Sequence, residues 1–241
     1  MKEYKGKKIV PREIENIKLD NSPNNFHGGK YIGFCNLDGL PHGLGELISP
    51  PKDVEFDEEK NVIKVNIKDK HDKIPWSCNG EWEDGVFVKG TYNMPPLSRY
   101  EGSFKFNDDV GSGDWELHGN GIELYYQTDE NYKNNIVVGH VKGIFEGGSL
   151  LEGEILNPSL IKYSEHKGIK KIIIQKANIN RVFDKDFGAE INICFGEIFY
   201  EDGAHYKGEL DFDLPYGIGT MILADGNKKT CHWVHGNIQE K

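Results

Sequence analysis

Residues 206–219 read Tyr-Lys-Gly-Glu-Leu-Asp-Phe-Asp-Leu-Pro-Tyr-Gly-Ile-Gly, and this stretch decides the fold because its pattern recurs. It opens with Tyr-x-Gly and closes with an aromatic residue before Gly-x-Gly. Residues 31–45 and 100–121 repeat the pattern, with His before the closing Gly-x-Gly. From Tyr to the first Gly of Gly-x-Gly takes 12 residues after Tyr31, 19 after Tyr100 and 11 after Tyr206. The middle copy therefore contains an insertion, which we place at about residues 107–115.

Weaker copies lie between the strong ones. They keep the glycines and aromatic residues of a strand and turn but lose the closing step, and they span residues 80–92, 143–154 and 196–203. Self-similarity at a short period is the signature of a repeat architecture, in which each unit buries its apolar face only against its neighbours.

This pattern resembles the MORN repeat (membrane occupation and recognition nexus). The resemblance covers about half the chain, mainly residues 26–48, 78–126, 139–156 and 195–237. It implies a sheet of stacked β-hairpins. It also implies a protein of a kind that commonly acts as a scaffold, dimerises or sits at membrane-associated assemblies.

The residues support a hairpin fold independently. Asp-Gly pairs at 84–85, 202–203 and 225–226 predict type I′ turns. We expect the Gly of Tyr-x-Gly to leave room for an aromatic ring of the next hairpin, and the first Gly of Gly-x-Gly to supply a positive φ or a bulge. The predicted fold is all-β: an elongated antiparallel β-sheet solenoid of stacked MORN-type hairpins with two inserted segments.

The predicted organisation has an N-terminal cap at residues 1–25 and a single MORN-repeat β domain at 26–241. The inserts are residues 49–77 and 155–194. Alternation of Val and Ile with polar residues predicts a hairpin inside the first insert, from residues 54–56 and 62–68. In the second insert, residues 170–175 and 189–195 are expected to be strands that continue the sheet.

Composition excludes several classes of protein. Only four of 241 residues are Ala, which disfavours a helical bundle. The chain carries 29 Lys and Arg against 39 Asp and Glu, a net charge of −10, so nucleic-acid binding is not expected. No apolar run is long enough to cross a bilayer or to form a signal peptide, and we expect an intracellular, cytoplasmic protein. Richness in Ile, Lys and Asn suggests an AT-rich genome, such as that of a protist or a large DNA virus, so a viral or cytoskeletal assembly is one expected setting.

The cysteines, histidines and paired carboxylates are residue types that can form catalytic or metal sites, but structural roles explain them better in this sequence. The four cysteines are far apart without a Cys-x-x-Cys pair, so we expect small buried apolar residues and no metal site or cofactor. His42 and His118 fall on the closing step of the repeat, where a turn-capping or packing role is expected. Acidic pairs, of which those at i and i+2 lie on one face of a strand, allow a remote carbohydrate-hydrolase hypothesis. These pairs are Glu81/Glu83, Asp108/Asp109, Asp184/Asp186 and Asp211/Asp213. A solvated sheet face explains them better, and the chain has no Gly-x-Ser-x-Gly nucleophile motif, so no enzymatic activity and no small-molecule substrate are expected.

Aromatic side chains give the candidate partner contacts. Trp115, Tyr125 and Tyr126 flank or follow the insertion of the middle copy, and one side chain of an adjacent pair on a strand is expected to face solvent. Residues 230–235 form the expected edge strand of the last repeat. We expect a partner chain or a second copy to dock there, by strand addition or by burying Trp233.

The expected function is therefore a non-enzymatic structural or adaptor protein that uses a MORN-repeat sheet for protein–protein interaction or assembly, including assembly into a virion. The alternative is a peripheral membrane module that binds phospholipid headgroups. A local basic cluster would be needed, and residues 162–176 provide one, with candidate lipid contacts at Lys162, Lys167, Lys170 and Lys171.

Overall fold

Every regular element that the computed structural model describes is a strand, and they fall into two compact units, Met1–Ile136 and Val137–Lys241. The structure describes residues 2–17, 19, 29–49, 54–56, 62–65, 76–94, 98–107, 114–128, 135–158, 168–184, 189–211 and 214–239. The all-β prediction is confirmed. The predicted single domain at 26–241 differs from this division, and residues 1–25 contribute strands to the first unit.

The strands of the first unit are β1 (Lys2–Tyr4), β2 (Lys7–Ile17), β3 (Gly29–Cys35), β4 (Pro41–Ile48), β5 (Val54–Phe56), β6 (Val62–Val65), β7 (Ser77–Glu83), β8 (Val86–Met94), β9 (Ser98–Asn107) and β10 (Asp114–Thr128). Those of the second unit are β11 (Asn135–Glu146), β12 (Ser149–Leu156), β13 (Ile169–Asp184), β14 (Ala189–Tyr200), β15 (His205–Asp211), β16 (Leu214–Ile222), β17 (Lys228–Val234) and β18 (Asn237–Ile238).

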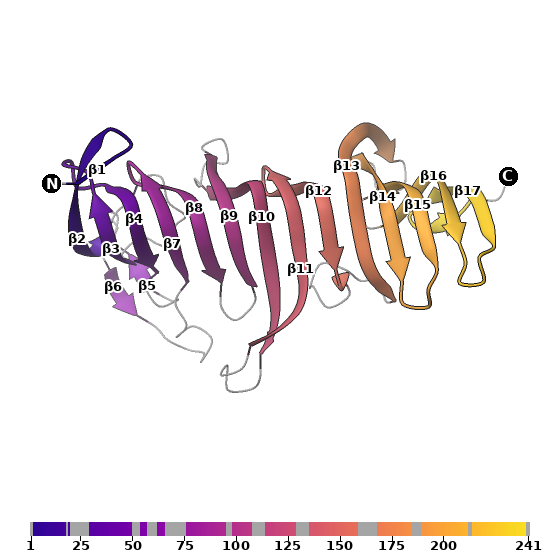
Figure 1. Ribbon diagram of the computed structural model, residues 1–241, viewed down its shortest axis with the longest axis horizontal. Coiled ribbons are helices and arrows are strands. Elements are labelled where there is room, and N and C mark those ends of the chain that lie inside the picture. Colours follow the sequence, from indigo (N-terminus) through magenta and orange to yellow (C-terminus); the bar gives the residue numbers. More distant parts are fainter. Residues whose placement is uncertain are drawn as a thin grey trace. The chain divides into compact units, whose positions relative to one another are not determined.

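Within each unit the strands pair antiparallel in chain order, which is the topology of consecutive hairpins (Figure 1). β5 and β6 are the exception, because they pair with each other as a separate sheet. This confirms the predicted hairpin in the first insert. β13 and β14 pair with each other and with β12 and β15, so the predicted strands of the second insert do continue the sheet.

A row of glycines marks the same level on successive strands. In the first unit the paired residues across six strands are Gly33, Gly45, Gly80, Gly90, Gly102 and Gly121. In the second unit they are Gly143 and Gly153, then Ile174, then Gly196, Gly208 and Gly219. The weak copies seen in the sequence therefore align with the strong ones. Ile174 of β13 interrupts the row, and Arg12 of β2 and Cys231 of β17 stand opposite its terminal glycines.

The tyrosine of each Tyr-x-Gly lies over this row. Tyr31, Tyr100 and Tyr206 are fully buried. The hydroxyl of Tyr31 donates to the carbonyl of Phe34 at 2.8 Å, and the hydroxyl of Tyr206 donates to the carbonyl of Glu209 at 2.8 Å. A Cβ atom on Gly45 or Gly219 would overlap the ring and hydroxyl of the tyrosine above it. The expectation that the ring comes from the next hairpin is wrong, since each tyrosine covers glycines of its own hairpin.

The closing Gly-x-Gly bends the strand, as predicted. Its first glycine has φ of 103° at Gly43, 64° at Gly119 and 54° at Gly217. The register also shifts beside each one, so the strand is bulged there. Such a φ favours glycine over any residue with a Cβ.

The turns correct one sequence prediction. Asp84 and Gly85 both have positive φ, at 49° and 88°, as a type I′ turn requires. At the other two Asp-Gly pairs only the glycine is left-handed, with φ of 88° at Gly203 and 86° at Gly226. Hydrogen bonds from Tyr200 N to Ala204 O and from Leu223 N to Asn227 O close three-residue loops instead. These are type I turns that end in a glycine bulge.

Candidate functional site: the outer face of the sheet

The two faces of the sheet differ sharply in burial. In the first unit Tyr31, Leu47, Cys78 and Tyr100 lie in one row and are 0% exposed, so they mark the inner face. Neighbouring residues along a strand point to opposite faces. The adjacent row therefore lies on the outer face, and it contains Ile32, Glu46, Asn79, Thr91 and Glu101.

Exposed apolar side chains recur at one position of the repeat on this outer face. The middle residue of Gly-x-Gly is Leu44 in the first copy and Ile218 in the last, and they are 60% and 67% exposed. Asn120 holds the same position in the middle copy and is also exposed. Two of three equivalent positions thus present a branched aliphatic residue to solvent, between glycines that offer it no side-chain contacts.

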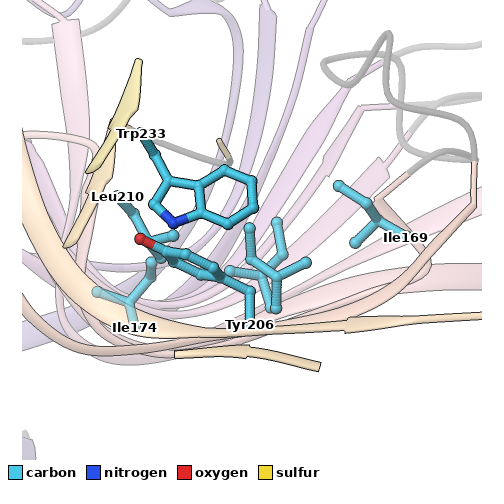
Figure 2. Close-up of a cluster of buried hydrophobic side chains, with 7 residues drawn as sticks. Ile169, Ile174, Tyr206, Leu210 and Trp233 are labelled. Atoms are coloured by element: carbon cyan, nitrogen blue, oxygen red, sulfur yellow. The ribbon is translucent and has the colours of Figure 1, made fainter. Parts of the chain in front are cut away.

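Tryptophan residues reinforce the inner face at the same level. The indole N–H of Trp82 donates to the carbonyl of Gly45 at 3.1 Å, and the ring meets Tyr31 edge-on with centroids 5.5 Å apart. Trp233 repeats both contacts, with a 3.1 Å bond to the carbonyl of Gly219 and a centroid distance of 5.4 Å to Tyr206 (Figure 2).

Trp233 is therefore covered by its own unit and is only 5% exposed. The sequence predicts that its strand lies at the edge, but β18 pairs with β17 at Trp233 and Val234. Its indole has no surface to offer a partner in this structure. The correction has a physical reason, because the type I′ turn at His235 and Gly236, with φ of 45° and 78°, lets the chain reverse once more.

The other aromatic candidates are also largely buried. Trp115 is 8% exposed and packs against Trp82 and Phe87, with centroids 5.7 and 5.4 Å away. Tyr125 and Tyr126 are half-buried on β10. Tyr125 and Ser98 hydrogen-bond to the carboxyl of Glu123, but burial outweighs these bonds and raises its pKa.

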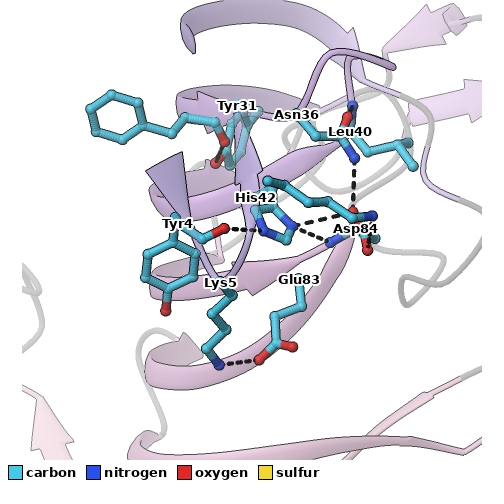
Figure 3. Close-up of polar contacts among 10 residues, drawn as sticks. Tyr4, Lys5, Tyr31, Asn36, Leu40, His42, Glu83 and Asp84 are labelled. Atoms are coloured by element: carbon cyan, nitrogen blue, oxygen red, sulfur yellow. Dashed lines mark hydrogen bonds and ion pairs between the residues drawn. The ribbon is translucent and has the colours of Figure 1, made fainter. Parts of the chain in front are cut away.

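The N-terminal hairpin is part of the sheet through the pairing of β2 with β3, and it also makes polar contacts with β7 (Figure 3). Tyr4 donates its hydroxyl to Glu81 Oε2 at 2.7 Å, and Lys5 forms an ion pair with Glu83. These interactions join residues of the β1–β2 hairpin to β7, which lies far along the sequence. The pair Glu81/Glu83, considered above as a hydrolytic pair, is thus occupied in holding this hairpin.

His42 and Asp84 lie at the centre of the docking contacts. Nδ1 of His42 lies 3.2 Å from both the backbone N and the carboxylate Oδ1 of Asp84, and Nε2 lies 3.1 Å from the carbonyl oxygen of Tyr4. Lys7 reaches Oδ2 of Asp84 at 2.6 Å. This hydrogen bond is the main cause that lowers the pKa of Asp84, and a bond from Asn36 adds to it. The expected turn-capping role of His42 is confirmed.

The second unit uses different residues at the corresponding turn. In the first unit Asn36 donates to Oδ1 of Asp84 at 2.8 Å. At the equivalent place, five residues after the repeat tyrosine, Asp211 lies 3.3 Å from Nδ1 of His235. In the second unit the carboxylate of Asp211 therefore stands at the position of Asn36, and His235 stands at the position of Asp84.

Carboxylates on the second unit are paired with neighbouring lysine and histidine side chains. Burial works to raise the pKa of Glu197, but hydrogen bonds from Lys207 and His205 outweigh it and the pKa is lowered. Hydrogen bonds from Lys171 first and His140 second lower the pKa of Glu154.

The predicted lipid cluster does not form one patch among the described residues. Lys171 lies 2.6 Å from Glu154 Oε2 and is therefore already paired. Lys170 is exposed and lies where the register of β13 shifts, between Ile169 and Lys171. Lys162 and Lys167 lie outside the described residues.

Chemical sites are sparse in the part of the chain that the structure describes. It contains no group of three or more His, Cys, Asp or Glu placed to hold a metal ion. The cysteines there are free thiols, with Cys35 and Cys78 buried as expected. No described helix is long and apolar enough to span a membrane. Of the remaining carboxylate pairs, Asp108/Asp109, Asp186 and Asp213 fall outside the described residues.

Comparison with known proteins agrees with the repeat. The MORN repeat model matches residues 37–54 and 206–228, which contain Leu44 and Ile218. A search of the curated proteins found no match. The chain therefore carries MORN repeats, which often mediate interactions with proteins or membranes.

Sequence reasoning missed the two features that distinguish the outer face. One is the exposed aliphatic residue inside Gly-x-Gly, whose signal is an apolar side chain flanked by two glycines on a strand. The other is the docking of Tyr4 and Lys5 on β7, for which no local pattern exists.

Proposed function

We propose that this protein is a non-enzymatic, intracellular adaptor that binds protein partners on the outer face of its MORN sheet, as a component of a larger assembly. The observation that carries the proposal is the exposure of Leu44 and Ile218, 60% and 67%, at equivalent positions of the two matched repeats. A large aliphatic residue has no role in folding at such a place, since Asn120 occupies it equally well in the middle copy.

Burial of these side chains by a partner gives binding free energy. Full burial of a Leu or Ile side chain contributes about 1.5–3 kcal/mol, and aliphatic anchors surrounded by polar residues are typical of interface centres. Because the two residues lie on different units, one partner or two could be recruited, and bivalent attachment would raise the apparent affinity.

Affinity purification followed by mass spectrometry tests the proposal. The variants Leu44→Asn and Ile218→Asn install the residue of the middle copy, so we expect both to fold as the wild type does. Partners retained by the wild type should be lost or depleted at least about fivefold with the double variant. Leu223→Asn is the matched control, because Leu223 is an exposed turn residue, 49% accessible, outside Gly-x-Gly. Equal recovery of every partner by the double variant would contradict the proposal.

Phospholipid binding is the second candidate function, and the family's known interactions favour testing it. The net charge of −10 and the pairing of Lys171 with Glu154 argue against binding to anionic lipid. Flotation with phosphatidylserine vesicles at physiological salt should leave the protein unbound. Cofloating protein that is released by Lys170→Glu would favour the membrane role instead.

A further inference from the structure

The N-terminal hairpin shows what kind of ligand the outer face of the first unit accepts. Tyr4 and Lys5 of the β1–β2 turn region contact the carboxylates of Glu81 and Glu83. Lys2 also places its ammonium group 5.4 Å from the ring centre of Phe34. The surface thus binds an extended segment that combines cations with an aromatic or apolar side chain.

The same surface continues beyond the hairpin. Leu44 pairs with Glu81 across β4 and β7, and Ile32 pairs with Glu46 across β3 and β4. These four residues lie on the outer face, where Leu44 and Ile32 are 60% and 44% exposed. Among the described residues no cation forms an ion pair with Glu46. The uncovered part therefore offers two aliphatic side chains beside a carboxylate.

The carboxylates near the exposed aliphatic residue differ between the two units. The register that pairs Leu44 with Glu81 pairs Ile218 with His232 in the second unit. There the neighbouring carboxylate is that of Glu209, and its Oε2 already accepts a hydrogen bond from the backbone N–H of Ile218 at 3.2 Å. Charge complementarity therefore favours a cationic ligand at Glu46 of the first unit.

We propose that Ile32, Leu44 and Glu46 bind an extended, lysine-bearing segment of a partner protein, with apolar side chains on Ile32 and Leu44 and a lysine on Glu46. This inference rests on the proposed function and names the chemistry of one partner. The segment lies beside the chain's own N-terminal hairpin and repeats its mode of attachment. Exposed ion pairs contribute little individually, so the aliphatic contacts provide affinity and the carboxylates provide selectivity.

Fluorescence anisotropy with a labelled peptide of alternating lysine and valine tests the inference. The wild-type protein should bind this peptide and should not bind its counterpart of alternating glutamate and valine. Glu46→Lys should weaken binding by about tenfold, and Leu44→Asn should weaken it several-fold without changing its salt dependence. Glu201→Lys, at an exposed turn of the second unit, reverses the same charge elsewhere and should change binding less than about twofold.

Three outcomes would overturn the inference: no binding of the lysine peptide to the wild type, equal binding of the acidic peptide, or unchanged binding by Glu46→Lys. Circular dichroism of each variant checks that the sheet is intact. If the lysine peptide does not bind but the affinity purification still finds partners that depend on Leu44 and Ile218, only the cationic ligand is refuted. Loss of both would refute the adaptor function as well.

Discussion

The indole N–H of Trp233 donates to the backbone carbonyl of Gly219 across 3.1 Å. The carbonyl belongs to the glycine that lies beneath Tyr206, so one tryptophan secures both the strand and the ring packed on it. Trp82 makes the same bond to Gly45 in the other unit. The first and last copies thus each combine a glycine, a tyrosine and a tryptophan.

Replacing Trp233 by Phe removes this hydrogen bond and part of the packing. We expect Trp233→Phe to lower the free energy of unfolding of the second unit by about 1–2 kcal/mol, because a buried carbonyl loses its donor. Urea denaturation followed by circular dichroism measures the change. Trp82→Phe should give a similar loss, and an unchanged urea midpoint for both would show that the bond does not stabilise the sheet.

Gly219→Ala should destabilise more than Gly226→Ala. A Cβ on Gly219 would overlap the ring of Tyr206, whereas one on Gly226 meets nothing within 4 Å. Gly226 has φ of 86°, so its alanine variant carries only backbone strain, about 1 kcal/mol. We expect at least about 2 kcal/mol for Gly219→Ala. Equal thermal midpoints for the two variants would mean that Tyr206 does not lie over Gly219.

Glu123 gives stability a pH dependence of known sign. Burial raises the pKa of Glu123, so folding favours the protonated form. Its contribution is fully present below the unfolded-state pKa and is lost as pH rises through the folded-state value. Glu123→Gln should therefore melt at a higher temperature than the wild type at about pH 8, with the gap closing near pH 4. Glu101→Gln, on the exposed outer face, is the control and should show no such gap.

Asp84 contributes a pH dependence of stability with the opposite sign to that of Glu123. The hydrogen bond from Lys7 lowers the pKa of Asp84 below its ordinary value of 3.8. Its contribution is present above that value and is lost as pH falls through the folded-state pKa. Hydrogen exchange of residues 2–9 should accelerate below about pH 4 in the wild type relative to the rest of the sheet, after correction for intrinsic exchange rates. Asp84→Asn should exchange faster already at neutral pH and lose this dependence, and retention of the acid transition would assign it to another group.

Sequence alone predicts the repeat because its residues have local reasons for being there. Glycine is required at the bend and beneath the tyrosine, so Tyr-x-Gly followed by Gly-x-Gly recurs in the three strong copies although the length between them varies. The turn type could not be predicted from Asp-Gly. The same dipeptide forms a two-residue loop at Asp84 and part of a three-residue loop at Asp202, and the register of the flanking strands decides between them.

Burial of the aromatic residues could not be predicted either. Trp233 looks like an edge residue in sequence, and only the pairing of β18 with β17 and the packing on Tyr206 show that it is covered. The exposed Leu44 is the converse case. An apolar residue on a strand is ordinarily expected in the core. Leu47 is buried, side chains alternate along β4, and Leu44, three residues earlier, therefore points to the outer face.

The central claim is that Leu44 and Ile218 contact protein. Site-specific photo-crosslinking in the native source tests it most directly, with a benzophenone amino acid at position 44, 218 or 120 in the full chain. The account predicts crosslinked protein partners from positions 44 and 218, and at most weak crosslinking from position 120, where the chain itself carries Asn. Crosslinking to lipid alone, or equal yields from all three positions, would contradict it.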